Sequence, residues 1–487
     1  MKPFFLPVVA IALVGLHVSC NKETGSTAVM PAVTPLVSTT TTTPAPTGLV
    51  FYVSGAAGSD SRTVNEAKNP ATPWKTIQKG ISSIPGGSTL IIAGGTYTEK
   101  VVVPTSANGM ATAPTLIRNK AGETPILDGN NAGMQWETLF QLKDNQYVTV
   151  KGLKAQNGFW YGFAGESSKN IAFDSCATFN TRASGIYVKT SSAFAISNNN
   201  VRKACQELKR DANGNGTQEC ITVGACNDFV INGNEVWDTT FSGEGGEGID
   251  AKGGCYNGEI AGNYVHDVFR LGIYVDAGSK EEYNIRVHGN RVINTGGLSV
   301  AGELGGHARD IYVYNNLVVN SKSSGVTFQS IGNGKFTNVY IVNNTFYNNA
   351  QNGFAGEVGN YGKNTGDQNI VIRNNVFYNK TANYRFSIWH DMAASHVIGN
   401  NLYFDFKPSN NSTNSFNAAK LTAADVQADP QFMNVAGNDF SLKATSPAIN
   451  KGVVVNLPGT QAAPLFTTDF NGKSRGTSNW DMGAFEF

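Results

Sequence analysis

The stretch Ile231-Asn232-Gly233-Asn234-Glu235-Val236 and its later copy Ile260-Ala261-Gly262-Asn263-Tyr264-Val265 determine the fold of this chain. They share the motif Ile-x-x-Asn-x-Val, which recurs through the middle of the sequence. Its asparagines fall at Asn199, Asn234, Asn263, Asn290, Asn316, Asn344, Asn375 and Asn400. Successive asparagines are separated by 25 to 35 residues, and a repeat of that length indicates a solenoid.

A second motif, a glycine followed by alternating apolar residues, precedes most of these asparagines. It occurs as Gly185-Ile186-Tyr187-Val188, Gly248-Ile249-Asp250-Ala251, Gly272-Ile273-Tyr274-Val275 and Gly325-Val326-Thr327-Phe328. Alternation with a period of two is typical of strands, and no segment here keeps a helical stripe over three turns. Coiling the repeats pairs every strand with its equivalent in the next coil, whereas a flat sheet would leave open edges. We therefore predict an all-β parallel β-helix with the asparagines stacked as an internal ladder.

The composition excludes several classes of partner. The 487 residues contain 37 Lys+Arg and 36 Asp+Glu, which gives a formal net charge of +1. Nucleic acids and anionic membranes are bound through a basic field or stripe, so neither is an expected partner. With 40% apolar residues the chain can bury a large core, and we expect a folded monomer.

The first 19 residues have the pattern of a secretory signal peptide, with Lys2 before an apolar run over 4–16. The run ends in His17-Val18-Ser19-Cys20, which resembles a loose bacterial lipobox with Cys20 as the lipidated residue. Cleavage by signal peptidase I, without a lipid, is the alternative. The Thr- and Pro-rich residues that follow, up to 48, predict an extended tether. We thus expect a lipoprotein of the outer membrane or cell surface of a Gram-negative bacterium, attached only through its lipid.

The start of the folded part carries a family resemblance. The segments Phe51-Tyr52-Val53-Ser54, Pro73-Trp74-Lys75-Thr76-Ile77-Gln78 and Gly95-Thr96-Tyr97 closely resemble the opening of right-handed parallel β-helix proteins of the pectate-lyase-like superfamily. The resemblance implies that 74–84 is an amphipathic helix that caps the open end. The superfamily includes lyases, hydrolases, epimerases and binding proteins, so the function has to come from the site.

The domain boundaries follow from the same resemblance. Segments near 429, 446 and 481 resemble a closing segment that is common in secreted members. We expect one β-helix domain over 49–487. Its parts are the cap and first coils (49–130), the central coils with the site (131–406) and the closing segment (407–487).

Stacking the glycine-led strands predicts three columns of side chains, with equivalent residues about 4.8 Å apart. The entrance column, just before the glycine, contains Ser184, Glu219, Glu247, Leu271 and Gly296. The next column, expected to point outward, contains Tyr187, Thr222, Asp250, Tyr274, Ser299 and Thr327. The last column, also outward, contains Lys189, Gly224, Lys252, Asp276, Ala301, Gln329 and Glu357. Ionisable groups therefore gather on neighbouring coils that carry Glu219, Glu247, Asp250, Lys252 and Asp276, beside Tyr274.

The spacing from Glu247 to Lys252 resembles the Glu-x4-Lys segment of chondroitinase-B-like and alginate polysaccharide lyases. This resemblance implies a Ca²⁺-assisted β-elimination on a polysaccharide that contains uronic acid. Glu219, Glu247 and Asp250 are the predicted calcium ligands. Lys252, with its pKa lowered by a neighbouring cation, is the predicted Brønsted base. On the next coil this chain departs from those lyases, because Asp276-Ala277-Gly278 stands where they carry Arg-His-Gly.

Two other functions stay open. Asp250 and Asp276 lie diagonally on adjacent coils, about 8 Å apart, and could serve as the two carboxyl groups of a glycoside hydrolase. The third possibility is a non-catalytic glycan-binding protein, in which exposed aromatic rings stack on sugars. The predicted stacking residues are Trp160, Tyr161, Tyr187 and Tyr274.

Further candidates flank the cluster. Arg270 enters the coil of Asp276 and is a predicted clamp for a substrate carboxylate. Glu303 and His307, in a glycine-rich turn, are also predicted to contact substrate. His266 and Asp267 resemble a catalytic dyad, but their columns predict a packing residue and a turn residue. The equivalents of Asp267 are Asp238, Asn294, Asn320, Asn348 and Asn379, and those of His266 are Trp237, Ile293, Val319 and Tyr347.

A second metal candidate precedes the cluster. Asp211-x-Asn213-x-Asn215-Gly216, with Glu219 at the ninth position, resembles the first half of a Ca²⁺ loop, although Thr222 occupies the acidic twelfth position. A polar turn is the alternative interpretation.

The cysteines predict disulfides beside this site. Cys226 and Cys255 each lie five residues before a repeat isoleucine, so they occupy one position on consecutive coils and are predicted to pair. Cys205 and Cys220 bracket the Asp211 loop and are a second predicted pair. Cys176 aligns with inward valines and is expected to stay reduced.

Overall fold

The computed structural model describes most of the chain from residue 48 onward. The described residues are 48–132, 136–158, 160–207, 219–239, 245–330, 332–351, 356–361, 366–379, 388–389, 396–405, 421–457 and 463–487. All of them lie in one compact unit. The predicted signal peptide, the predicted lipidation site Cys20, the predicted tether up to residue 47 and the Asp211 loop lie outside the described residues.

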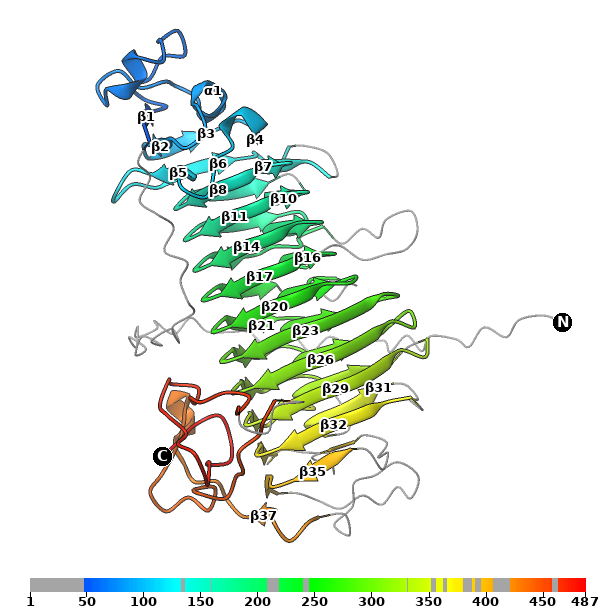
Figure 1. Cartoon of the computed structure of the whole chain (residues 1–487). Helices are drawn as coiled ribbons and strands as arrows, with labels where there is room; N and C mark the ends of the chain where they lie inside the picture. Colours follow the sequence, from blue (N-terminus) through cyan, green and yellow to red (C-terminus); the bar gives the residue numbers. More distant parts are fainter. Residues whose placement is uncertain are drawn as a thin grey trace, which may run out of the picture. The chain divides into compact units, whose positions relative to one another are not determined.

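Three long parallel sheets, stacked coil upon coil, form the fold (Figure 1). Each coil contributes one strand to sheet A, the next to sheet B and the third to sheet C. Sheet A consists of β1 (Val50–Val53), β2 (Thr89–Ile92), β5 (Thr115–Asn119), β8 (Gln146–Lys151), β11 (Lys169–Asp174), β14 (Ser192–Ser197), β17 (Asn227–Asn232), β20 (Tyr256–Ala261), β23 (Glu281–His288), β26 (His307–Tyr314), β29 (Lys335–Val342), β32 (Gln368–Arg373) and β35 (Val397–Gly399). Sheet B consists of β3 (Gly95–Tyr97), β6 (Pro125–Asp128), β9 (Lys154–Gly158), β12 (Ala177–Thr181), β15 (Asn200–Arg202), β18 (Glu235–Thr239), β21 (Tyr264–Val268), β24 (Arg291–Ile293), β27 (Leu317–Val319), β30 (Thr345–Tyr347), β33 (Val376–Tyr378), β36 (Leu402–Phe404) and β37 (Val426–Gln427). Sheet C consists of β4 (Val101–Val103), β7 (Thr138–Lys143), β10 (Tyr161–Glu166), β13 (Ile186–Lys189), β16 (Ile221–Gly224), β19 (Ile249–Lys252), β22 (Ile273–Asp276), β25 (Leu298–Ala301), β28 (Val326–Gln329), β31 (Val358–Tyr361) and β34 (Ile388–Trp389).

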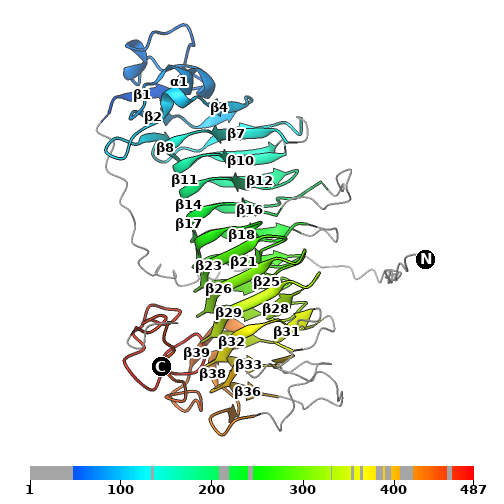
Figure 2. The same ribbon diagram turned by 45° about the vertical axis from the view of Figure 1, so that its right-hand side comes forward.

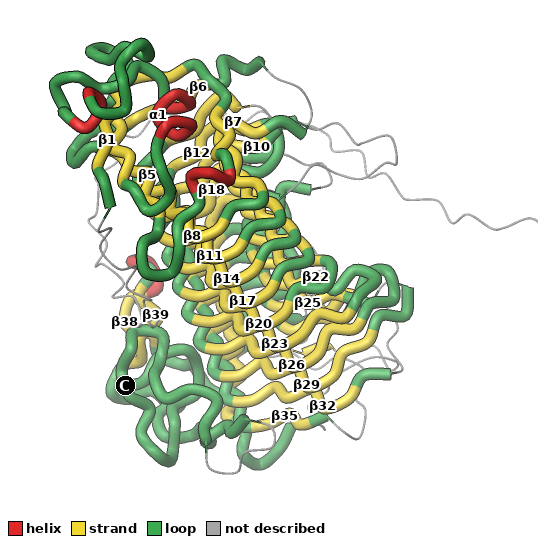
Figure 3. Tube along the Cα trace, turned by 45° about the horizontal axis from the view of Figure 1, so that its top comes forward, coloured by secondary structure: helices red, strands yellow, loops and turns green. Residues whose placement is uncertain are grey.

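This architecture confirms the predicted right-handed parallel β-helix, and the stacking is visible along the column in Figure 3. The inward side chains of all three sheets form a continuous apolar core. Because every strand pairs with its equivalent one coil away, a side chain has a neighbour of the same column above and below it. Columns of like residues therefore determine both the core and the outer face.

The predicted asparagine ladder is present at the turn between sheets A and B. Asn234 Nδ2 donates to Asn263 Oδ1 at 2.9 Å and to the carbonyl of Ile196 at 2.9 Å. The same pattern continues from Asn199 to the last described coils. There one prediction is wrong by a residue: Asn375 Nδ2 donates to Asn401 Oδ1 at 3.1 Å, so the ladder uses Asn401 and not Asn400. The prediction chose the wrong residue because Asn400 and Asn401 are adjacent in the sequence.

An N-terminal capping helix is present, but it is shorter than the predicted 74–84, because Trp74 forms a β-bridge with Val53 and the helix begins only after Thr76. Helix α1 (Ile77–Ser83) covers the first coils (Figure 2). Trp74, Ile77 and Ile81 are fully buried. The helix starts because Thr76 accepts a hydrogen bond from the Lys79 amide at its N-cap. Glu99 also accepts from the Ile77 amide at 2.8 Å and the Gln78 amide at 2.9 Å. Short 3₁₀ turns are η1 (Glu66–Lys68), η2 (Thr105–Ala107) and η4 (Val435–Gly437).

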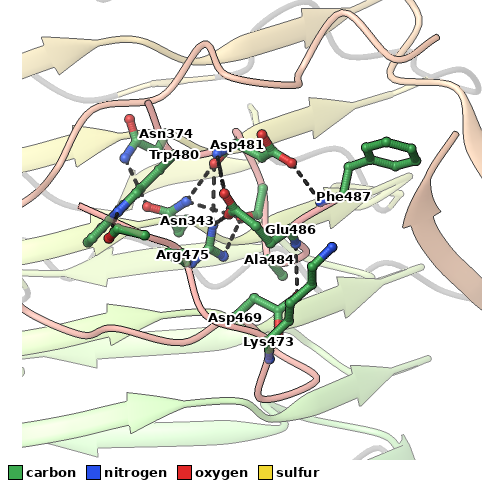
Figure 4. Close-up of polar contacts among 12 residues, drawn as sticks. Asn343, Asn374, Asp469, Lys473, Arg475, Trp480, Asp481, Ala484, Glu486 and Phe487 are labelled. Carbon is green, nitrogen blue, oxygen red and sulfur yellow. Dashed lines mark hydrogen bonds and ion pairs between the residues drawn. The ribbon is translucent and has the colours of Figure 1, made fainter. Parts of the chain in front are cut away.

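The C-terminal segment packs on the outside of the coils, with its own hairpin of β38 (Phe432–Asn434) and β39 (Asp439–Leu442). It is fastened at the corner between sheets A and B (Figure 4). There the buried Arg475 donates to Asn315 Oδ1 at 2.9 Å and to Glu486 Oε2 at 2.7 Å. Asn343 Nδ2 in turn donates to the Asp481 carbonyl at 2.9 Å. Sheet C, which carries the predicted site, is left clear of these contacts.

Among the helices of the described residues, none has the length and apolar character needed to cross a membrane.

Candidate functional site

The register of sheet C brings the predicted cluster together. Tyr187, Thr222, Asp250, Tyr274, Ser299 and Thr327 pair in that order from β13 to β28. The last column also follows the prediction up to Gln329. Glu357 is wrongly placed in it, because Val326 pairs with Val358 and Glu357 therefore lies level with Gly325. Glu357 is buried and accepts from Asn349 Nδ2 at 2.7 Å, away from the cluster.

Lys252 is at the centre of the cluster. Its Nζ lies 2.6 Å from Glu219 Oε1 and 3.5 Å from Asp250 Oδ2. Glu219 is fixed in turn by Thr222, whose hydroxyl donates to Oε2 at 2.9 Å. Asp276 follows on the next strand, where it pairs with Lys252 across β19 and β22. One ammonium group thus lies among carboxyl groups contributed by three consecutive coils.

Burial separates these side chains into two layers. The side chain of Lys252 is 30% exposed, whereas that of Asp250 is 2% exposed, and Glu219 is also buried. Asp276 is partly exposed like the lysine. The outward orientation predicted for these columns therefore holds, but most of the acidic side chains are covered. Substrate reaching this face would meet Lys252 and Asp276 before the buried carboxyl groups.

The carboxylates around Lys252 determine the direction of its pKa shift. Burial by itself disfavours the ammonium form, but the carboxylates of Glu219 and Asp250 outweigh this effect and raise the pKa of Lys252 above its usual value. A lysine in this environment stays protonated at neutral pH. The lowering that a Brønsted base requires is predicted only beside a bound cation, and it stays a prediction.

The pKa values of the carboxyl groups in the cluster are raised above those of ordinary surface acids. Burial raises the pKa of Asp276 to about 6. Burial likewise raises the pKa of Glu247 to about 7, although Arg270 opposes the shift. The pKa of Asp250 is raised well above its usual value by burial, with Lys252 opposing. A group of acidic side chains with raised pKa values on one face of a sheet is a candidate catalytic site.

Arg270 and Tyr274 extend the cluster, as predicted. Arg270 Nε lies 2.7 Å from Glu247 Oε1, and the guanidinium side chain remains 35% exposed. The hydroxyl of Tyr274, which is buried, donates to Glu303. Glu303 therefore belongs to the site, and Tyr274 fixes its position.

His307 does not belong to the site. It begins β26 on sheet A, where its Nε2 lies 2.9 Å from Thr337 Oγ1 and its Nδ1 lies 3.6 Å from Glu281. The prediction failed because the glycine-rich turn between Glu303 and His307 changes sheets. His266 packs between Trp237 and Tyr264, and Asp267 adopts a left-handed turn conformation with φ of 51°, as their columns predicted.

The predicted calcium ligands do not form a cation site in this arrangement. Both oxygens of Glu219 are used by Lys252 and Thr222, and Glu247 Oε1 is used by Arg270. Among the residues that the structure describes, no three acidic, histidine or cysteine side chains converge to hold a metal ion. Asp211 lies outside these residues. Calcium binding stays a prediction, and no chemical step below depends on it.

Cys226 and Cys255 lie where the register places them, but as thiols. Cys226 and Cys255 occupy one position on consecutive coils, and the Cys226 amide donates to Cys255 Sγ at 3.4 Å. Each sulfur points to a carbonyl of its own coil, Cys226 to Gly224 and Cys255 to Lys252, so the side chains run parallel. A disulfide needs them turned toward each other, and the predicted Cys226–Cys255 bond is absent.

The second predicted pair of cysteines also lies close together. Cys205 and Cys220 are neighbouring buried thiols, and burial followed by the hydrogen bond with Cys220 raises the pKa of Cys205. Cys176 is a buried thiol, as expected, but its position was mispredicted. Its amide donates to Asn199 Oδ1 at 2.8 Å, so it continues the asparagine ladder and does not align with the valines.

The aromatic residues of sheet C form a group of their own on its outer face. Trp160, Tyr161 and the partly exposed Tyr187 pack together, with the rings of Tyr161 and Tyr187 stacked at 4.3 Å. Trp160 and Tyr161 are buried, so they are not the open stacking surfaces that were predicted. Trp136, just before β7, is an exposed aromatic ring beside this group, and it was not among the predicted stacking residues. Its position in a loop next to the other aromatic residues would have suggested it.

Comparison with known proteins agrees with this architecture. Residues 56–243 match the family described as "Pel9A-like, right handed beta helix region". The chain is 26% identical to the uncharacterized protein YwoF of Bacillus subtilis (strain 168) over 465 residues, which cover 82% of this chain and 92% of YwoF. It is 25% identical to the pectate lyase PEL9 of Emericella nidulans over 210 residues, which cover 40% of this chain and about half (48%) of PEL9.

Among solved structures, pectate lyase Pel9A superposes with a TM-score of 0.50 at 15% identity, over 90% of this chain and 96% of Pel9A. A likeness at that identity shows the fold. The chain therefore has the fold of a right-handed parallel β-helix, and its residues 56–243 are similar to the Pel9A-like region.

Proposed function

We propose that this protein is a polysaccharide lyase that cleaves a glycan containing uronic acid at the outer face of β19 and β22. One observation carries the proposal: Lys252 and Arg270 are partly exposed, whereas the carboxyl groups that hold them in place are buried. An anionic sugar approaching this face meets the ammonium and guanidinium groups first. The resemblance to proteins named pectate lyases supports the choice of reaction.

The two chemical requirements of the reaction are met by Lys252 and Asp276, the partly exposed residues of the cluster. β-Elimination requires that the charge of the uronate carboxylate be neutralised and that a base remove the neighbouring proton. Lys252, which the carboxylates of Glu219 and Asp250 keep protonated, neutralises the uronate. Asp276 is the base, because a carboxylate with a pKa of about 6 is ionised at neutral pH and is more basic than an ordinary aspartate. As Asp276 takes the C5 proton, a double bond forms between C4 and C5, the C4–O bond breaks, and the departing oxygen takes a proton from water.

Arg270 and Glu303 assist at the edges of the cluster. Arg270 binds a second substrate carboxylate through the part of its guanidinium that Glu247 leaves exposed. Glu303, positioned by Tyr274, adds negative charge that helps to raise the pKa of Asp276.

Glycoside hydrolysis is the second candidate, because an acid with a pKa of about 6 also suits protonation of a leaving group. The predicted pair with Asp250 is unfavourable, since that side chain is buried beneath Lys252. Glu303, which is partly exposed, would supply the second carboxyl group. Non-catalytic glycan binding is the third.

One experiment separates the three functions. The protein is incubated with polygalacturonate, alginate and neutral xylan while the ultraviolet absorbance of unsaturated sugars and the number of reducing ends are followed together. A rise in both signals with an acidic glycan is the expected result. Reducing ends without absorbance indicate hydrolysis, and the absence of both signals on all three glycans contradicts the enzyme.

We also propose that the chain is exported and held at the outer membrane or cell surface by a lipid on Cys20, since its leader has the pattern of a lipoprotein signal. Metabolic labelling with a radioactive fatty acid tests this. Label is expected in the wild type and not in Cys20→Ala, and an unlabelled wild type would contradict the anchor.

A further inference from the structure

We infer that Trp136 is a remote subsite that binds the sugar ring of a glycan chain whose scissile bond lies at Lys252. The inference rests on the proposed function for the identity of the chain, but not for the existence of the subsite. It goes beyond the cluster itself, because Trp136 lies before β7 and shares no contact with Lys252 among the interactions of the described residues.

Trp136 is exposed in an unusual way. Its side chain is 56% exposed, whereas most tryptophan side chains are largely buried. Its backbone has a φ of 69°, in the left-handed region that a bulky residue rarely adopts. Strain of this kind persists where the surrounding structure imposes it, often at a ligand contact. The strain and the exposure together indicate that the ring is held out for a partner.

The ring is supported from beneath. The centroid of Trp136 lies 5.7 Å from that of Trp160, which is only 4% exposed. Arg182 lies 5.7 Å from the Trp160 ring and forms an ion pair with Glu207. Trp136 remains 56% exposed above this support, and a flat aromatic ring of this type stacks on the apolar side of a sugar ring.

The position of Trp136 relative to the cluster fits one glycan chain. Sheet C runs in the order β7, β10, β13, β16 and β19, so the coil of Trp136 is four steps from that of Lys252. Four steps of about 4.8 Å span about 19 Å. Lys143 is the residue of β7 in register with Lys252, and Trp136 lies seven residues before it, up to about 23 Å along the strand. The two residues are therefore up to about 30 Å apart, diagonally across the face. A polysaccharide lying along this face reaches both places, whereas a disaccharide bound at Lys252 does not. The subsite therefore acts on long substrates only.

The test measures binding and cleavage separately. Trp136→Ala, Trp136→Phe, the matched control Phe487→Ala and the wild type are run by electrophoresis in gels that contain polygalacturonate or alginate. Phe487 is a suitable control because it is 54% exposed and belongs to the C-terminal segment on the other sheets. Retardation of the wild type and Phe487→Ala, weaker retardation of Trp136→Phe and little retardation of Trp136→Ala are expected. With a polymer that the wild type cleaves, Trp136→Ala should raise KM about threefold to tenfold and leave kcat unchanged.

The outcomes distinguish the subsite from the function. Equal retardation of Trp136→Ala and wild type overturns the subsite, as does the absence of retardation of the wild type in both gels. If the wild type is retarded through Trp136 but cleaves nothing, the subsite stands and the lyase proposal fails. Thermal unfolding of Trp136→Ala at the wild-type temperature excludes a folding defect, and unchanged turnover of a disaccharide substrate confirms that the ring acts at a distance.

Discussion

The Nζ atom of Lys252 lies 2.6 Å from Oε1 of Glu219, a residue 33 positions earlier in the chain. The two meet because β16 and β19 are adjacent strands of sheet C and the lysine reaches back across them. Asp250 lies on the same side of the ammonium group, at 3.5 Å. The lysine is therefore both an exposed cation and the counter-ion of a buried acidic layer, and its removal affects stability as well as activity.

We expect Lys252→Ala to lower activity at least 100-fold, because a charge that neutralises the substrate is lost. The variant should also be less stable at pH 7 by about 2 kcal/mol, below the usual cost of breaking a fully buried pair because Lys252 is partly exposed. The cost should shrink at pH 5, where Asp250, whose pKa is raised, becomes neutral more readily. Urea denaturation at both pH values measures it.

Lys189→Ala is the matched control for this variant. Lys189 belongs to the same column of sheet C, two coils before Lys252, but it is exposed and is not held by buried carboxyl groups. It should keep wild-type activity and stability. A Lys252→Ala enzyme with full activity would contradict both of the roles considered for this lysine.

The pH profile tests the role of Asp276. Its pKa is raised to about 6, so it gains its negative charge as the pH rises through that value. If it acts as a base, kcat/KM should rise about tenfold per pH unit below pH 6 and level off above it. A rate that falls above pH 6 would indicate an acid, and with it hydrolysis.

Asp276→Asn should reduce kcat by about 100-fold or more while KM changes little, because the amide keeps the shape of the side chain but cannot accept the proton. Its Oδ1 accepts from the Gly278 amide at 2.7 Å, which the amide oxygen of asparagine can also do, so the fold should be retained. Steady-state kinetics on the cleaved glycan decides. Loss of the pH dependence near 6 in the residual activity would assign that ionisation to this residue.

The cluster of Lys252 and Asp276 could be predicted from sequence because a β-helix repeats its strands at a nearly constant interval. Once Gly248 and Gly272 are aligned, every following position of the two strands is fixed. The alignment failed at Glu357, where the connection from β28 to β31 is longer and the count of residues no longer gives the register. An alignment of equivalent strand positions cannot show where a turn contains inserted residues.

Burial and charge pairing could not be predicted in the same way. An alignment shows that Asp250 points away from the core, but not that its neighbours on adjacent coils cover it. The sign of the pKa shift of Lys252 depends on that cover and on the reach of Glu219 across the coil. The same limitation explains the cysteines, since adjacent positions on two coils do not determine the direction of the side chains.

The thiols can be counted directly. Without reduction, peptide mapping of denatured protein alkylated at once should find Cys226 and Cys255 carrying the alkyl group, because in the folded protein the sulfurs point to carbonyl oxygens and not to each other. In native protein both should react slowly, since burial raises the pKa of each thiol and excludes the reagent. A Cys226–Cys255 disulfide in the map would show that the side chains rotate after folding.

The ladder offers a test of the fold itself through two adjacent asparagines. Asn401→Ala removes the acceptor of the Asn375 amide and side chain, at 2.9 and 3.1 Å, and the donor to the Ile372 carbonyl at 3.0 Å. Buried groups left unpaired cost about 1 to 3 kcal/mol each, so a loss of about 3 kcal/mol or more is expected. Asn400→Gly should cost little, because its φ of 55° suits glycine. Chemical denaturation followed by circular dichroism compares the two, and an Asn400 variant as damaged as the Asn401 variant would show that the ladder ends in the other register.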